Sequence, residues 1–338
     1  MIQQAIKKII QFQDLTIEEA KQAMDEVLDG GATPAQVSAF LIGLRMKGES
    51  IDEITGCALT MKQKASHIKP RVGGYLDCVG TGGDGANTFN ISTTASFVIA
   101  AAGVPIAKHG NRAISSRSGS ADLLEELGVN IMLEPKKVQQ CVEETGIGFM
   151  FARTFHKYMK TASQVRAELK VRTIFNILGP ISNPSDAKYQ FIGVFDPKLT
   201  HPLASAMAKM GVMDGMVMCG VDNGMDEFST LGETRVAEIK NGEVLCYTAT
   251  PEQYGLPRAA AADIQGGTAR ENAKITRDIL EGQAGPKRDI VVLNAGASIY
   301  CAGRADSVRQ GVLMAQEALD SGRALEKLNA LIKRSNEV

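Results

Sequence analysis

The sequence lacks an excess of charge of either sign. Its 37 lysines and arginines and 38 aspartates and glutamates leave a formal net charge of −1, and no block of basic residues is present. A protein whose main partner is nucleic acid or an anionic membrane usually carries a basic excess. The charge balance therefore predicts no nucleic acid and no membrane among the partners.

Closely spaced metal ligands are also lacking. The six cysteines and four histidines are scattered, with no C-x-x-C pair, so a zinc site is not expected. No apolar run approaches the roughly 18 residues of a membrane span, and the first residues do not have the pattern of a signal peptide. These absences predict a reduced, cytoplasmic protein.

Glycine is present in surplus. The 34 glycines make up about 10% of the 338 residues, against roughly 7% in average proteins, whereas 44% hydrophobic and 22% charged residues are ordinary values. A chain of this length holds one large domain or two unequal ones. The glycine surplus indicates many tight loops between strands and helices.

Residues 1–70 are predicted to form a small all-helical domain. Capping boxes begin at Thr16, Thr33 and Ser50, each with Glu or Gln three residues later. Apolar residues recur at helical spacing behind each of them, and short loops join the helices, which favours an antiparallel cluster. Apolar side chains beyond those needed for its core are available for a subunit contact.

From residue 71 to residue 338 the pattern changes to alternating strands and helices. Strands are expected at residues 75–79, 104–107, 147–151, 191–195, 216–220 and 290–293. Such alternation favours a mostly parallel sheet with helices on both faces, and Asn241-Gly242 predicts a peripheral hairpin. The predicted fold class is therefore α/β, with a small all-helical domain and a larger α/β domain around a mostly parallel central sheet.

A glycine-rich loop follows the first expected strand. It reads Gly80-Thr81-Gly82-Gly83-Asp84, and backbone N–H groups can approach an anion closely where no Cβ intervenes. The polar residues that come next, before an apolar helix at about 95–102, are Thr88, Asn90, Ser92 and Thr93. Asn90 or Ser92 is expected to cap this helix and direct its positive end toward the loop.

A second loop with cations and hydroxyls follows the next strand. It opens with Lys108-His109-Gly110-Asn111-Arg112 and continues through Ser115, Ser116 and Arg117 to Ser120. A glycine turn alone is usually only a turn, and neither G-x-G-x-x-G nor G-x-x-x-x-G-K-[ST] is present. Both loops follow strand ends, where ligands bind in parallel sheets. Glycines, amides, hydroxyls and three cations together predict a polyphosphate site.

These stretches resemble the anthranilate phosphoribosyltransferase family in order and spacing, over nearly the whole chain. The resemblance implies that phosphoribosyl pyrophosphate binds along residues 80–84, 90–93 and 108–120. It also implies transfer of the phosphoribosyl group to the amine of anthranilate in tryptophan biosynthesis, giving N-(5-phosphoribosyl)anthranilate and pyrophosphate. Lys108 would help to neutralise the pyrophosphate, and a homodimer through the N-terminal helices is expected.

The acceptor half of the site is implied by the same resemblance. Arg166 would hold the acceptor carboxylate, a task that suits a planar bidentate cation. His109, Asn111, His156 and Pro180 would line the pocket, with the two histidines as orienting groups. The segment at about 163–182 would join the helical domain.

At four positions near this pocket the sequence departs from the family pattern. Arg153 and Lys157 stand where proline is common, and Ser163-Gln164 replaces a frequent Ala-Pro. Arg153 is expected beside the acceptor channel, where a long cation could narrow the channel or attract a second anionic group. The acceptor assignment therefore carries less weight than the phosphoribosyl assignment.

Asp226 and Glu227 follow another strand and are expected to hold Mg²⁺. This ion favours one or two carboxylates completed by substrate oxygens and water. A lone Asp-Glu pair is more often surface polarity, so the role again depends on the family, where the matching pair binds magnesium and the serine matching Ser92 helps to hold another ion. The expected cofactor is Mg²⁺.

Three other functions remain open. A pyrimidine nucleoside phosphorylase shares this architecture, and phosphate-dependent release of a pyrimidine base would identify it. A catalytically silent relative could bind nucleic acid, which salt-sensitive DNA binding without Mg²⁺-dependent turnover would reveal. A transferase for another aromatic amine is suggested by Arg153 and Lys157.

Overall fold

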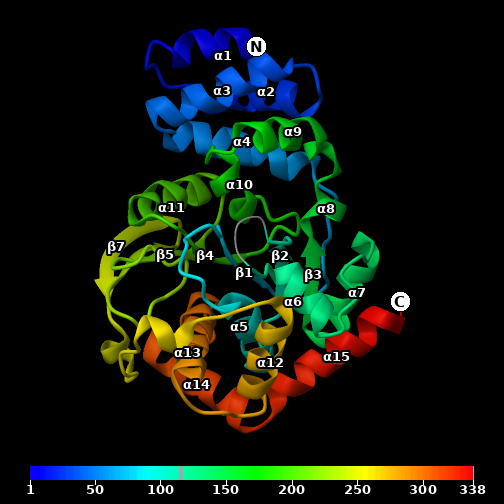
Figure 1. Cartoon of the computed structure of the whole chain (residues 1–338), viewed down its shortest axis with the longest axis vertical. Coiled ribbons are helices and arrows are strands. Elements are labelled where there is room, and N and C mark those ends of the chain that lie inside the picture. Colours follow the sequence, from blue (N-terminus) through cyan, green and yellow to red (C-terminus); the bar gives the residue numbers. More distant parts are fainter. Residues whose placement is uncertain (114–116, 338) are drawn as a thin grey trace.

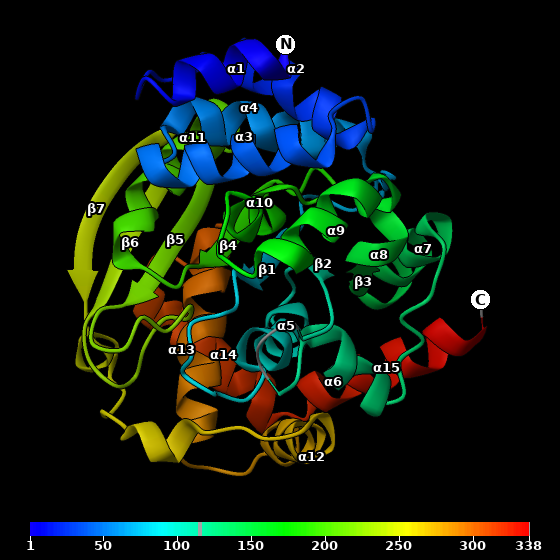
Figure 2. The ribbon, with the colours of Figure 1, turned by 45° about the horizontal axis from the view of Figure 1, so that its top comes forward.

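The computed structural model describes residues 1–113 and 117–337. A layer of helices at the N-terminal end lies on a larger α/β body (Figure 1). The helical layer begins with α1 (Ile2–Ile9), α2 (Ile17–Leu28), α3 (Pro34–Lys47) and α4 (Ile51–Lys64). Two later helices, α9 (Lys160–Leu169) and α10 (Phe175–Ile181), also belong to it by contact, because α9 packs on α2 and α3 and α10 packs on α4 (Figure 2).

The three predicted capping boxes are confirmed. Thr16, Thr33 and Ser50 are the N-cap residues of α2, α3 and α4, and each side chain accepts a hydrogen bond from the backbone three residues later. Each box satisfies two backbone donors that a helix start otherwise leaves free. The helix starts are therefore encoded locally.

Glu53 joins the capping box of α4 to the segment just before α2. Its Oε2 accepts the Ser50 N–H at 2.8 Å, and its Oε1 accepts the Leu15 N–H at 3.0 Å. Lys47 lies 2.9 Å from the same carboxylate and also pairs with Asp14. A fully buried carboxylate is tolerated here because donors and a cation surround it.

The strands form one seven-stranded sheet over the described ranges, in the order β3-β2-β1-β4-β5-β6-β7. β1 to β5 are parallel, and β6 and β7 add an antiparallel edge. Their bounds are β1 (Leu76–Gly80), β2 (Ile106–Gly110), β3 (Ile147–Phe151), β4 (Tyr189–Gly193), β5 (Asp214–Gly220), β6 (Thr234–Lys240) and β7 (Glu243–Ala249). The predicted mostly parallel sheet is confirmed, and Asn241 and Gly242 make the hairpin turn with φ of 51° and 81°.

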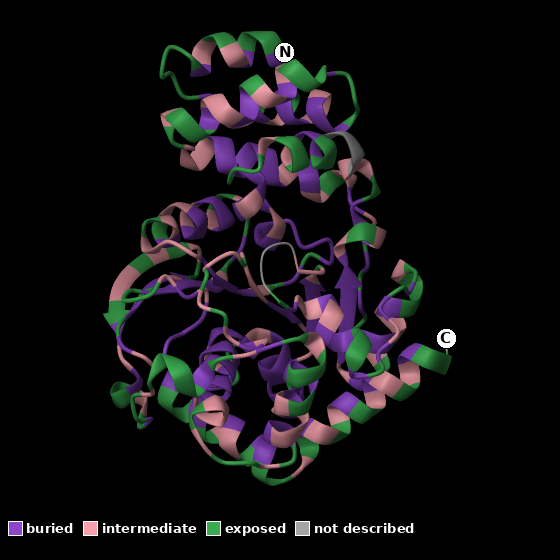
Figure 3. Cartoon of the chain, viewed as in Figure 1, coloured by how far each residue is buried: buried purple, intermediate pink, exposed green. Residues whose placement is uncertain are grey.

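Helices cover both faces of this sheet. The helices of the α/β body are α5 (Ile91–Ala101), α6 (Ser120–Glu126), α7 (Pro135–Thr145), α8 (Ala152–Phe155), α11 (Thr200–Lys209), α12 (Ala269–Leu280), α13 (Pro286–Cys301), α14 (Val308–Asp320) and α15 (Arg323–Glu337). α5 and α13 pack on the face opposite α11, and strands β1 to β5 are almost entirely buried (Figure 3).

The expected strand at 290–293 is wrong. These residues lie inside α13, a helix whose residues from Ile290 to Ile299 are all buried. Such a helix shows no polar face, so its β-branched run cannot be told from a buried strand by periodicity. α13 and α14 also approach closely, because a Cβ on Gly311 would lie 2.1 Å from the Gly296 carbonyl oxygen.

Two hydrophobic cores meet at the sheet. One unites β1 to β3 with α5, α7 and the C-terminal helices. The other unites α1 to α4, α9 and α10 with α11 and the opposite face of β4 to β6. The helical layer is thus continuous in packing with one face of the sheet, and the division at residue 70 stays a prediction.

Among the described residues, no helix is long and apolar enough to cross a lipid bilayer.

Candidate active site

The site lies where the strand order reverses. Successive strands run from β1 outward to β3, and the chain then returns to place β4 on the other side of β1. Loops at the carboxyl ends of β1 and β4 consequently diverge and leave room for a ligand. Gly80 and Gly193 are the last residues of these two strands and are paired in register.

The segment at Asp226 lies directly on these two glycines. A Cβ on Gly193 would lie 1.6 Å from the Asp226 carbonyl oxygen, and a Cβ on Gly80 would lie 2.2 Å from Asp226 Oδ2. Any larger residue would displace this segment. The two glycines therefore bring the predicted magnesium ligands to the predicted phosphate loop.

Asp226 is tied to the glycine loop by hydrogen bonds. Its Oδ2 accepts the Gly82 N–H at 2.6 Å, and its own N–H donates to Asp84 Oδ2 at 3.4 Å. Gly82 and Gly83 both have positive φ, 66° and 73°, which only glycine adopts without strain. The loop therefore wraps around a carboxylate in this structure.

Glu227 caps helix α5. Its Oε1 accepts the Ser92 N–H at 3.0 Å, in the first turn of the helix. Asn90 occupies the predicted N-cap position of α5, but the side-chain cap hydrogen bond expected of it is not made. A carboxylate distant in sequence takes this place, at the positive end of the helix dipole.

The acidic groups of the site have raised pKa values. Burial, and then the nearby Asp84 carboxylate, raise the pKa of Asp226 to about 7. Burial and the charge of Asp226 raise the pKa of Glu227 well above its usual range. Three neighbouring carboxyl groups, of which Asp84 raises the pKa of Asp226 and Asp226 that of Glu227, form a site that a cation would stabilise.

The donor set fits magnesium shared with a substrate. Within residues 1–113 and 117–337, no group of three His, Cys, Asp or Glu side chains could hold a metal by itself. Mg²⁺ is usually held by one or two carboxylates with substrate oxygens and water. Asp226, Glu227 and the hydroxyl of Ser92 match that requirement.

Lys108 lies beneath the loop as a buried cation. Its Nζ donates to the Cys78 carbonyl and lies 3.5 Å from Ser92 Oγ. Lys108 also acts electrostatically on Glu227. Lys108 therefore lies between the end of β1 and the start of α5, near the carboxylate of Glu227.

Asn90 joins three segments rather than capping a helix. Its Nδ2 donates to the Ser118 carbonyl at 3.1 Å, and its Oδ1 accepts from Ser118 Oγ at 3.1 Å and from Asn272 Nδ2 at 2.9 Å. Thr88 lies nearby in a β-bridge with Gln265, and Thr93 is buried in α5. These contacts join the segment before α5 to the second loop and to α12.

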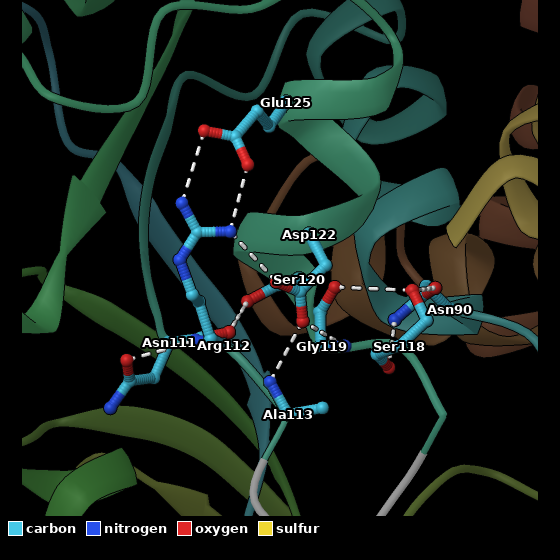
Figure 4. Close-up of polar contacts among 9 residues, drawn as sticks. All are labelled: Asn90, Asn111, Arg112, Ala113, Ser118, Gly119, Ser120, Asp122 and Glu125. Carbon is cyan, nitrogen blue, oxygen red and sulfur yellow. Dashed lines mark hydrogen bonds and ion pairs between the residues drawn. The ribbon is translucent and has the colours of Figure 1, made fainter. Parts of the chain in front are cut away.

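Arg112, in the second loop, pairs with acidic residues of the protein and is not free for the expected anion. Arg112 pairs with Asp122 at 2.9 Å and with Glu125 at 2.8 Å, on α6 (Figure 4). The hydroxyl of Ser120 donates to the Asn111 carbonyl at 3.3 Å. Of the three expected cations, Arg112 is thus neutralised by its neighbours, and Arg117 is exposed. Ser115 and Ser116 lie outside the described residues.

Two buried histidines meet at the expected acceptor pocket. His109, near the end of β2, and His156, after α8, lie with their Nε2 atoms 3.0 Å apart. Burial lowers the pKa of His156 to about 4, and burial and the charge of His156 lower the pKa of His109 well below its usual value. Burial thus favours the neutral form of both rings.

Helices α9 and α10 carry the other expected acceptor residues. Arg166 lies over the ring of Phe175 at 5.3 Å, and the Gly179 backbone lies close enough to the His109 ring to affect its pKa. Phe175 and Gly179 are four residues apart and share one helix face. Pro180 is buried beside them.

Arg166 is available to an anion. It is half-buried, and no hydrogen bond or ion pair of its guanidinium is found among the described residues. Burial lowers its pKa, but a guanidinium stays charged. Arg153 and Lys157 are exposed.

Three residues of the site were not anticipated from the sequence. Asn272 binds Asn90, and Tyr158 lies 2.6 Å from His156 Nδ1. Arg172 donates to the Gly83 carbonyl and covers the Phe195 ring at 4.0 Å, so it links the helical segment to the glycine loop. All three lie in stretches that resemble the family, but none was predicted as a site residue.

Comparison with known proteins identifies the family. A model described as the helical bundle domain of a glycosyl transferase family matches residues 3–65, and one described as the a/b domain of such a family matches residues 73–325. Anthranilate phosphoribosyltransferase of Acetivibrio thermocellus is 51% identical over 99% of this chain and 97% of its own. The chain belongs to the anthranilate phosphoribosyltransferase family. Anthranilate phosphoribosyltransferase of Geobacter sulfurreducens is 49% identical over the full length of both chains.

Solved anthranilate phosphoribosyltransferases share the fold. The enzyme of Thermus thermophilus is 44% identical, with a TM-score of 0.93 over 98% of this chain and 99% of its own. The Saccharomyces cerevisiae enzyme with phosphoribosyl pyrophosphate and magnesium is 26% identical, with a TM-score of 0.89, and covers 100% of this chain and 98% of its own. A complex of the yeast enzyme with 4-fluoroanthranilate scores 0.88 at 25% identity, with the same coverage. The predicted family and fold class are confirmed.

Replacing Gly193 with alanine should detach the Asp226 segment from the sheet. The new Cβ would overlap the Asp226 carbonyl, at an expected cost of about 1–3 kcal/mol. Hydrogen exchange followed by mass spectrometry should show faster exchange at the amides of Gly82 and Ser92, which the Asp226 and Glu227 carboxylates protect. Gly73→Ala is the matched control, since its Cβ meets nothing within 4 Å. Unchanged protection of both amides in Gly193→Ala would contradict the contact.

Proposed function

We propose that this chain transfers the phosphoribosyl group of phosphoribosyl pyrophosphate to the amine of anthranilate. The products are N-(5-phosphoribosyl)anthranilate and pyrophosphate, and the reaction belongs to tryptophan biosynthesis. The observation that carries the proposal is the identity of 51% to a relative of this name, along nearly the whole of both chains. The enzyme acts in the cytoplasm, in line with six free cysteines, all within the described residues.

The donor binds at the two loops beyond β1 and β2. The backbone amides of the glycine loop and the start of α5 face the pyrophosphate, and Lys108 supplies a fixed positive charge. Thr88, Ser92 and Thr93 line this region, and Asn90 holds it to the second loop. Asn111 and Ser120 hold the second loop in turn to the start of α6.

Magnesium completes the donor site. Asp226, Glu227 and Ser92 would hold it, since the two carboxyl groups have raised pKa values and lie against the glycine loop. The ion supplies charge stabilisation for the pyrophosphate oxygens. The yeast relative with phosphoribosyl pyrophosphate and magnesium supports this assignment.

The protein favours departure of pyrophosphate by fixed charge. Negative charge grows on the leaving oxygen as its bond to C1 breaks, so donors already aimed at that oxygen stabilise the transition state most. Lys108 is such a donor, because burial and its hydrogen bond to Cys78 fix its position. No reorganisation of this side chain is needed during the step.

The acceptor binds between α10 and the end of β2. Arg166 holds the carboxylate of anthranilate, and His109, His156, Asn111 and Pro180 form the walls that orient its amine toward C1. Positioning of two reactants in this way removes much of the entropic barrier to their reaction. The yeast relative with 4-fluoroanthranilate supports an acceptor of this class.

Replacing Arg166 with alanine should raise the KM for anthranilate by about 10- to 100-fold, because a charge-assisted bidentate contact is lost. The loss of anthranilate fluorescence measures turnover. Arg166→Lys keeps the charge without the planar fork and should fall between the parent and Arg166→Ala. A rise in the KM for phosphoribosyl pyrophosphate alone would contradict the acceptor role.

Replacing Asp226 with alanine should raise the Mg²⁺ concentration for half-maximal rate by at least about tenfold, because one ligand is removed. Titration calorimetry of phosphoribosyl pyrophosphate, with and without Mg²⁺, tests the same role without turnover. Asp222→Ala removes an exposed carboxylate of the same loop and serves as the control. An identical Mg²⁺ dependence in Asp226→Ala and the parent would sink the metal assignment.

The chain is further proposed to form a homodimer through its N-terminal helices. Ile10, Phe12 and Met46 are 65%, 70% and 74% exposed. They lie where the Lys47–Asp14 ion pair joins the ends of α1 and α3. Large apolar side chains gathered at one end of a helical layer are typical of a subunit contact.

Replacing Ile10 and Met46 together with glutamate should turn the dimer into a monomer at micromolar concentration, because buried charges without partners oppose association. Sedimentation velocity distinguishes the two states. Leu313→Glu, on α14, changes an apolar residue of similar exposure away from this face and should stay dimeric. A parent protein that sediments as a monomer would refute the dimer itself.

A further inference from the structure

A buried asparagine of α12, Asn272, lies beside the expected donor site. It is 1% exposed and belongs to the first turn of the helix. The loop before this helix runs along the segment before α5, because the Gly266 N–H donates to the Asn87 carbonyl at 2.9 Å. A Cβ on Gly266 would lie 2.5 Å from Phe89 Cα. A late part of the chain is therefore packed against the residue that immediately precedes Asn90.

Two backbone groups fix the direction of the Asn272 and Asn90 side-chain amides. The Gly267 N–H, which can only donate, lies 2.8 Å from Asn272 Oδ1, so the nitrogen of that amide faces Asn90. The Ser118 carbonyl, which can only accept, lies 3.1 Å from Asn90 Nδ2. Asn272 Nδ2 and Asn90 Oδ1 then meet at 2.9 Å as donor and acceptor. The two ends require the same orientation of both amides.

The Asn90 amide makes three hydrogen bonds, two of them with Ser118. The Ser118 hydroxyl donates to Asn90 Oδ1 at 3.1 Å (Figure 4). An asparagine amide has two donor hydrogens and two acceptor positions. The position that has no partner among residues 1–113 and 117–337 is one hydrogen of Asn90 Nδ2. A ligand that contacts this amide must therefore accept a hydrogen bond, as the oxygens of phosphoribosyl pyrophosphate do.

We propose that Asn272 is a positioning residue for the donor substrate. It fixes the Asn90 amide so that this amide offers an N–H, and no oxygen, to phosphoribosyl pyrophosphate. The inference deepens the proposed function and rests on it for the identity of the ligand.

A reversed Asn90 amide would be opposed at both of its ends. Its nitrogen would face the nitrogen of Asn272, and its oxygen would face the Ser118 carbonyl oxygen. Buried donors and acceptors without a partner are costly, and Asn90 is half-buried. The N–H is therefore oriented before the ligand arrives, which lowers the cost of binding.

Neutron diffraction from deuterium-exchanged crystals of the free protein tests the orientation directly, because it distinguishes N–D groups from oxygen. The nitrogen of Asn90 should lie at the Ser118 carbonyl, and the nitrogen of Asn272 should lie at Asn90. The opposite orientation of either amide in the parent protein overturns the proposal.

Asn272→Asp tests the role in binding. The substitution keeps the shape and the acceptor for Gly267 but places an oxygen against Asn90 Oδ1. The Kd for phosphoribosyl pyrophosphate with Mg²⁺, measured by titration calorimetry, should rise by about 5- to 50-fold, and the KM for anthranilate should not change. An unchanged Kd, or a rise in the KM for anthranilate alone, overturns the role.

Thr276→Val is the matched control on the same face of α12, one turn further along. It removes the buried contact between the Thr276 and Thr94 hydroxyls, 2.9 Å apart, without touching the Asn90 side chain. The Kd should stay at the value of the parent. A rise equal to that of Asn272→Asp would show that any loosening of α12 on α5 weakens binding, and would overturn a specific role of Asn272.

A double-mutant cycle with Asn90→Ala separates positioning from a purely structural role. If Asn272 acts through Asn90, the effect of Asn272→Asp on the Kd should disappear in the Asn90→Ala background, whereas additive effects would overturn the proposal. Asn90→Asp gives a second test that leaves α12 unchanged. It keeps the oxygen that faces Asn272 and removes the N–H, so an unchanged Kd would also overturn the proposal.

Failure of the proposed function gives a different result. If the parent does not bind phosphoribosyl pyrophosphate with Mg²⁺, the proposed function and the ligand of Asn90 are both overturned, while neutron diffraction still decides whether Asn272 orients Asn90. If the parent binds this donor but does not convert anthranilate, the acceptor assignment fails, and the Kd values of the variants still decide the role of Asn272.

Discussion

The site depends on one close approach, that of the Asp226 segment to the bare backbones of β1 and β4. Gly80 and Gly193 leave no room for a side chain beneath it. This contact lets one carboxylate bind the glycine loop and the next cap α5. The carboxylates of Asp226 and Glu227 thereby lie against the glycine loop and the start of α5, where the anion is expected to bind. Such an arrangement is repulsive toward phosphate by itself and becomes favourable with a divalent cation.

Local signals in the sequence predicted most of the fold. Capping boxes, strand periodicity and the Asn241-Gly242 turn each depend on a few neighbouring residues, and each is found in the structure. The segment at 290–293 was misassigned because its environment is set by tertiary packing: α13 is buried between the sheet and α14. No local pattern distinguishes such a helix from a strand.

The candidate site was predicted less completely, for a related reason. The glycine loop, Lys108 and the Asp-Glu pair stand in short motifs, and the family resemblance assigned them a role. The cap of α5 by Glu227 and the link of Asn90 to Asn272 join residues more than 130 positions apart. Arg112 was expected to face an anion, but two acidic residues one turn apart on α6 bind it first. Pairings of this kind depend on the topology.

The part of the site proposed for anthranilate differs from the part proposed for phosphoribosyl pyrophosphate in the elements that position its residues. The donor loops lie at the edge of one sheet and are joined to one another by direct hydrogen bonds. The proposed acceptor residues come from β2, α9, α10 and the segment after α8, where both hydrophobic cores meet. Among the polar contacts that cross there are Arg172 to the glycine loop and the hydrogen bonds that join His109, His156, Tyr158 and Met61. A shift of the helical layer would therefore change the acceptor pocket and, through Arg172, also reach the glycine loop. The geometry of the acceptor step is accordingly set by the contacts between these two layers, and that of the donor step by the sheet.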